Sequence, residues 1–210
     1  MTMITANQDG QNTDTSTEII QPLWVRITHW INAIAMVLMM TSGWQIYNAS
    51  PLFGLTFPPQ ITLGGWLAGA LLWHFAAMWL LVVNGLFYLT IGLWTGHFRR
   101  RLIPISMREL FGDIRDALTF RLSHADLSVY NAAQKFLYLG VIGAGILVAL
   151  SGLSIWKPVQ LQTLTAMFGG YDTARYVHFL AMAAIAGFIL MHVILAVLVP
   201  RSLRAMITGR

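Results

Sequence analysis

The feature that most constrains this chain is a run of residues between Arg175 and Arg201 that carries no charged side chain. A helix needs about 20 consecutive apolar residues to cross the hydrocarbon core of a bilayer. Three other runs are similarly long, so the sequence predicts four spans at about 28–47, 61–94, 136–156 and 177–199. Ala, Leu, Met and Gly are frequent in them, which favours helices over barrel strands. We therefore expect an all-α integral membrane four-helix bundle.

The composition agrees with a membrane protein. Only 10% of the residues are charged, whereas a soluble domain has about 25%. The chain has no cysteine, which excludes disulfides, iron–sulfur clusters and thiolate ligands. Residues 1–22 are polar and lack an apolar segment, so they predict a disordered cytoplasmic tail rather than a signal peptide. Residues 23–210 are expected to form one transmembrane domain, and no internal repeat is evident in the sequence.

Positive charge predicts the orientation, because Lys and Arg accumulate on the cytoplasmic side. Eleven of the thirteen basic residues fall before the first span, between the second and third, or after the fourth. Lys157 and Arg175 are the exceptions. Both termini are therefore predicted to be cytoplasmic. The same rule explains the arginine cluster, so we expect no nucleic-acid partner.

Four of the six histidines lie within the predicted spans, namely His29, His74, His178 and His192. Ionisable side chains inside a membrane are costly and are usually functional, although a single one often only bonds a neighbouring helix. His178 and His192 are fourteen residues apart. On a helix that places them about 21 Å apart on nearly the same face.

Depth then predicts which histidines meet. His29 begins the first span on the cytoplasmic side, so it can reach His192, and His74 in the outer half of the second span can reach His178. One difficulty is that His74 lies about 20 Å past Ile61, which is deep for an outer site. The excess length of the second run can accommodate this.

Two imidazole pairs stacked across a membrane are typical of b-type haem, whose iron takes axial imidazole nitrogens. A zinc site would need three or four ligands at one depth. A proton relay usually includes Asp or Glu, and the four spans contain neither. The sequence therefore predicts two haems b, with these four histidines as iron ligands.

Two arginines each precede a predicted ligand by three residues, Arg26 before His29 and Arg175 before His178. Each is a candidate contact for a haem propionate and equally a candidate interfacial anchor. Glycines in the spans would let a macrocycle, or simply another helix, approach the backbone.

The stretch "RITHWINAIAMVLMMTSG", together with His74 and the His178–His192 spacing, resembles the bacterial cytochrome b561 and nickel-hydrogenase b-subunit superfamily. That superfamily includes the b subunits of formate dehydrogenase and thiosulfate reductase. The resemblance implies two b haems with the same pairing, a quinone site near the cytoplasmic haem, and a partner enzyme outside. The loops "SPLFGLTFPPQITLGG" and "FRRRL" are similar to those of small b subunits that accompany periplasmic molybdopterin oxidoreductases.

The expected function is electron transfer between a periplasmic redox partner and the membrane quinone pool, in the bacterial inner membrane. One alternative is a stand-alone superoxide:quinone oxidoreductase, which would need a basic outer face. The outer face here offers Lys157 and Arg175 against Asp172. The second alternative is a membrane anchor without haem.

No motif marks a quinone site. The candidates are polar residues near the inner face, each of which could equally cap or bind a helix: Asn32, Asn84, Asn131, Gln134 and Lys135. Apolar residues in loops often mark interaction surfaces. Two outer loops contain such residues and predict either a docking surface or a lid over the outer haem: Leu52, Phe53, Leu55, Phe57, Leu161, Leu164, Met167 and Phe168.

Overall fold

The computed structural model describes residues 21–96, 98, 108, 112, 115 and 132–209, apart from the side chains of residues 132, 133, 201 and 202. Most of the expected N-terminal tail, His97, His124 and Asn131 lie outside this part. Along the chain the elements are α1 (Leu23–Ala49), the 3₁₀ turn η1 (Pro59–Ile61), α2 (Leu67–Trp94), α5 (Ala132–Trp156), α6 (Gln162–Met167), α7 (Tyr171–Leu198) and α8 (Pro200–Thr208).

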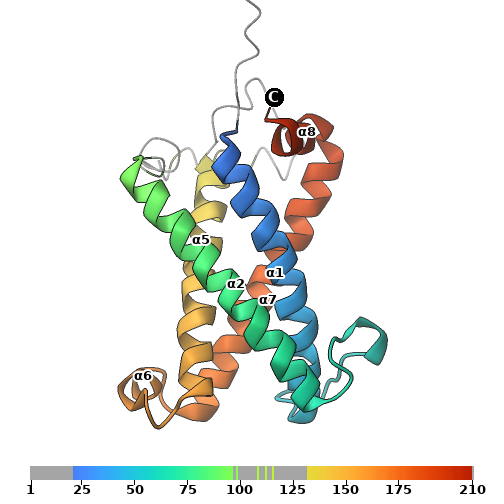
Figure 1. Ribbon diagram of the computed structural model, residues 1–210, viewed down its shortest axis with the longest axis vertical. Helices are drawn as coiled ribbons and strands as arrows, with labels where there is room; N and C mark the ends of the chain where they lie inside the picture. The colour runs from blue at the N-terminus through green and yellow to red at the C-terminus, as the bar shows by residue number, and fades with distance from the viewer. Residues whose placement is uncertain are drawn as a thin grey trace, which may run out of the picture.

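Four of these helices, α1, α2, α5 and α7, are long and apolar enough to cross a membrane. The described residues contain no strand, so the all-α membrane bundle is confirmed. The start of α1 and the short helix α8 lie at one end of the bundle, and α6 and the loop between α1 and α2 lie at the other (Figure 1). We call these the α8 end and the α6 end.

The second helix begins later than expected. Helix α2 starts at Leu67 rather than near Ile61, and the residues before it form a loop against α1, where the Leu63 N–H donates to the Thr41 carbonyl at 3.0 Å. Gly64 and Gly65 turn this loop with φ of 109° and 70°, a region that favours glycine. His74 is therefore only about 10 Å along its helix, which removes the difficulty over its depth.

The bundle is packed through small side chains. Helix α1 packs on α2, and α5 packs on α7. Among the described residues, the most buried apolar positions are mainly alanines: Ala35, Ala70, Ala77, Ala174 and Ala181. Larger side chains such as Leu72, at 74% exposed, and Leu198, at 71%, face outward. This arrangement suits a lipid environment, where small residues let helices approach and large apolar residues contact acyl chains.

Candidate functional site

The four intramembrane histidines lie in two pairs. The rings of His29 on α1 and His192 on α7 have centroids 5.9 Å apart and planes at 64°. The rings of His74 on α2 and His178 on α7 have centroids 6.5 Å apart and planes at 65°. We call the first the inner pair, because it lies toward the α8 end, and the second the outer pair. The structure thus brings together the residues whose depths match in the sequence.

The spacing of both pairs fits one metal ion between two imidazoles. A bond from a metal ion to imidazole nitrogen is about 2 Å long, so two imidazoles on opposite sides of one ion have centroids about 6 Å apart. Within the described part of the chain, no three His, Asp or Glu side chains gather as a metal site. Two ligands per site leave the equatorial positions to a macrocycle, so the residues fit haem iron and do not fit structural zinc.

The outer pair is held by a feature that the sequence analysis missed. The Ser42 Oγ lies 3.1 Å from His74 Nδ1, and the Ser151 Oγ lies 3.2 Å from His178 Nδ1. Each serine is fully buried and is followed by a glycine. The only sequence signal would have been the dipeptide Ser-Gly, which occurs once in α1, the helix beside His74, and once in α5, the helix beside His178.

Those two glycines keep space for the histidine rings. A Cβ on Gly43 would lie 3.3 Å from His74 Cε1, and a Cβ on Gly152 would lie 3.1 Å from His178 Cε1. Both distances are closer than ordinary van der Waals contact between carbons. A larger residue at either position would push the ring away from its partner.

The inner pair is surrounded by aromatic rings instead. Phe188 stacks on His192 with centroids 5.8 Å apart, and Trp30 meets His29 edge-on at 5.3 Å. Within the described part of the chain, the ring nitrogens of His29 and His192 form no hydrogen bond. The two pairs therefore differ in what holds the imidazoles.

The two predicted propionate arginines tie helix ends together in the structure. Arg26 donates through Nη2 to the carbonyl of Ile207 in α8, and its buried Nε has no hydrogen-bond partner within the described residues. Arg175 donates through Nη2 to the Ser50 carbonyl at 2.6 Å. Both arginines lie one helical turn from a histidine. The unpartnered Nε of Arg26 leaves one donor near the inner pair that a carboxylate could accept.

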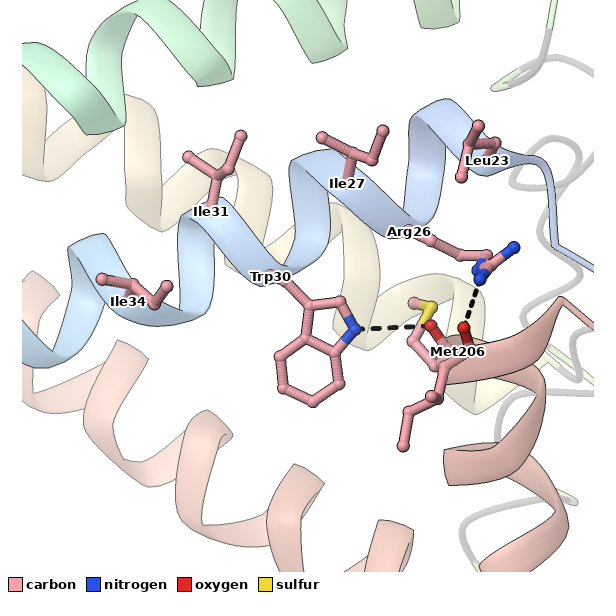
Figure 2. Close-up of a pocket in the computed structure, with 8 residues that line it drawn as sticks. Leu23, Arg26, Ile27, Trp30, Ile31, Ile34 and Met206 are labelled. Atoms are coloured by element: carbon pink, nitrogen blue, oxygen red, sulfur yellow. Dashed lines mark hydrogen bonds between the residues drawn. The ribbon is translucent and has the colours of Figure 1, made fainter.

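Helix α8, which the sequence analysis did not predict, folds back on the start of α1 and forms one side of a groove (Figure 2). Trp30 donates through Nε1 to the Met206 carbonyl at 3.3 Å. The groove has a volume of about 320 Å³ and a mostly apolar lining of Leu23, Arg26, Ile27, Trp30, Ile31, Ile34, Met206 and Ile207. Trp30 lines the groove and also contacts His29. The groove and the inner pair are therefore separated by a single indole ring.

Of the predicted quinone contacts, Asn84 is buried between helices. Its amide nitrogen donates to the Thr28 carbonyl at 2.8 Å and to the Asn32 Oδ1 at 2.7 Å. These bonds join α2 to α1 on both sides of His29 in the sequence, one residue before it and three residues after it. Gln134 and Lys135 lie in the first turn of α5, and among the described residues the asparagine side chains bond Thr28 and each other rather than α5.

A bundle of apolar helices with paired imidazoles at haem spacing defines the class of membrane b-type cytochromes. Residues 20–209 match the family described as prokaryotic cytochrome b561, and the chain belongs to this family. It is similar to the putative protein-methionine-sulfoxide reductase subunit YedZ1 of Azospira oryzae, with 52% identity over 190 residues, which cover 90% of this chain and 96% of that protein. The chain is therefore a haem-binding electron-transfer protein of the bacterial inner membrane.

Proposed function

We propose that this protein holds two haems b and passes electrons between a periplasmic redox subunit and membrane quinone. The observation that carries the proposal is the presence of two imidazole pairs at haem spacing, one toward each end of the bundle. Bound haem supplies one-electron redox chemistry, and the protein supplies ligands, spacing and an apolar surround. The α8 end is proposed to be cytoplasmic. Most of the basic residues lie before the first span, between the second and third spans, or after the fourth, and these segments all adjoin the span ends at the α8 end.

The partner is proposed to be a periplasmic, molybdopterin-dependent enzyme. This rests on the resemblance of the loops to those of small b subunits, and on the relative, whose name describes a subunit of a putative protein-methionine-sulfoxide reductase. A subunit role accounts for the chain better than a stand-alone superoxide oxidoreductase, because the outer face has few basic residues. The alternative of a membrane anchor without haem is disfavoured, because the chain belongs to a cytochrome family.

The α6 end offers a surface for that partner. Phe53 packs against Tyr176 and Phe179, with ring centroids 5.6 and 5.3 Å apart, so it is held against the stretch of α7 that carries His178. Leu55 is 72% exposed and Met167 is 79% exposed. These two side chains, rather than the phenylalanine, are the proposed docking contacts.

Quinone is proposed to react near the inner pair. The groove between α1 and α8 is apolar, includes the exposed side chains Ile27 and Ile34 of α1, and contacts His29 through Trp30. A quinone ring in this groove would find the Trp30 indole and the Arg26 guanidinium beside it. Asn32 and Asn84 are proposed to support this site by holding the start of α1 against α2.

The experiment is to purify the protein with its native neighbours and to compare it with a Leu55→Glu/Met167→Glu variant. We expect a redox protein to co-elute with the wild type and to be lost from the variant, because two charges would enter an apolar contact. Haem content, and haem reduction by a reduced naphthoquinone, should be unchanged in the variant.

Gln162→Glu is the matched control, since it adds one charge at an exposed polar position of α6. It should retain the partner. Full retention of the partner by the double variant would contradict docking at this surface, and failure of the naphthoquinone to reduce the wild-type haem would contradict the quinone assignment.

A further inference from the structure

The two helices that carry the outer pair are built alike. His74 is the eighth residue of α2, and His178 is the eighth residue of α7. Each helix follows a Gly-Gly pair with positive φ and has buried alanines four residues before and three residues after its histidine. In each case the facing helix supplies Ser-Gly to the ring. The structure thus contains a twofold repetition around the outer pair that the sequence did not reveal.

The hydrogen bonds of each serine indicate which atom is the donor in its contact with the imidazole. The hydroxyl of Ser42 donates to the Leu38 carbonyl at 2.5 Å, and that of Ser151 donates to the Leu147 carbonyl at 2.7 Å. A hydroxyl has one hydrogen, so each oxygen is left to accept. With the hydroxyl hydrogen on the helix carbonyl, the nearby histidine Nδ1 is the donor.

The surroundings of His178 support the same assignment independently. Its Nδ1 lies 3.0 Å from the carbonyl oxygen of Val148. A carbonyl only accepts hydrogen bonds, so Nδ1 carries the hydrogen and Nε2 is left with its lone pair. This is the tautomer in which Nε2 can bind a metal.

We propose that Ser42 and Ser151 are positioning residues. They hold His74 and His178 with Nδ1 protonated, which leaves Nε2 free to bind haem iron, and they would lower the reduction potential of the haem bound there. A hydrogen bond accepted from Nδ1–H makes the imidazole a more basic ligand, which stabilises the oxidised iron. Hydrogen bonding around the ligands is one of the means by which a protein sets haem potential. The inference rests on the proposed ligand role of the outer pair.

The test is a redox titration of Ser42→Ala, Ser151→Ala and the double variant, followed by absorbance. The outer haem is identified as the one missing from His178→Ala. Both haems should be retained. In the double variant, the ratio of reduced to oxidised outer haem should rise about tenfold at a fixed potential, which is about 59 mV for a one-electron couple. Ser151→Ala alone should have a smaller effect, because the Val148 carbonyl still accepts from His178.

Ser154→Ala is the matched control. Ser154 is equally buried on the same helix, but its hydroxyl donates to Thr165 at 3.0 Å and it accepts no hydrogen bond from a histidine, so the outer potential should not move. An unchanged outer potential in the double variant, with both haems present, would overturn the positioning role. Full haem content in His74→Ala would instead overturn the ligand assignment.

If the alanine variants lose the outer haem altogether, Ser42→Thr and Ser151→Thr decide the matter, because threonine keeps the hydroxyl. The outer haem and its potential should then be restored. Threonine variants that lose the outer haem as completely as the alanine variants would overturn the inference.

Discussion

Replacing His178 with alanine is expected to remove the outer haem and to leave most of the inner haem in place. His178 is the only described residue of α7 whose ring faces His74, while His29 and His192 form a separate contact. Without His178, only His74 of the outer pair would be left to bind the iron of a haem there. Absorption spectra and a pyridine haemochrome assay on the purified variant should show about half of the wild-type haem.

Two comparisons make this result specific to the pairing. His74→Ala should give the same spectrum as His178→Ala, and His29→Ala should lose the other haem. Loss of the haem held by His29 in a His74→Ala variant would contradict the pairing.

Gly152→Val is expected to lower the content of the outer haem sharply without replacing any ligand. The first side-chain carbon would already lie 3.1 Å from His178 Cε1 and 3.4 Å from its Nδ1, and valine adds two methyl groups. The ring must move, because overpacking forces side chains off their preferred rotamers at a cost of about 1–3 kcal/mol. Haem content and redox titration measure the effect.

Gly145→Val on the same helix is the control, because a Cβ there has no atom within 4 Å. It should keep both haems. Equal losses in the two variants would show that valine harms α5 in general and that Gly152 has no special place beside His178.

The four spans were predictable because a bilayer imposes length and apolarity on each helix, and these can be counted in a sequence. The meeting of His29 with His192 and of His74 with His178 followed from depth alone, because a helix fixes height at about 1.5 Å per residue. The structure brings those rings together, and their service as haem ligands remains a prediction. The sequence could not predict which side chains of neighbouring helices contact each other at a given depth.

Three misses show this limit. The start of α2 was placed too early because residues 61–66 are uncharged, and hydropathy does not register the left-handed Gly64 and Gly65. Helix α8 was missed because it is short and is held by backbone carbonyls that bond Arg26 and Trp30 from a distant part of the chain. Ser42 and Ser151 were missed for the same reason, since their importance depends on which side chain faces them.

The most direct test of the central claim is the number of haems per chain. Fully loaded, purified protein should give two haems b per polypeptide by pyridine haemochrome and protein quantification, and both should show the spectrum of iron with two axial imidazoles. One haem per chain, or none, would contradict the account.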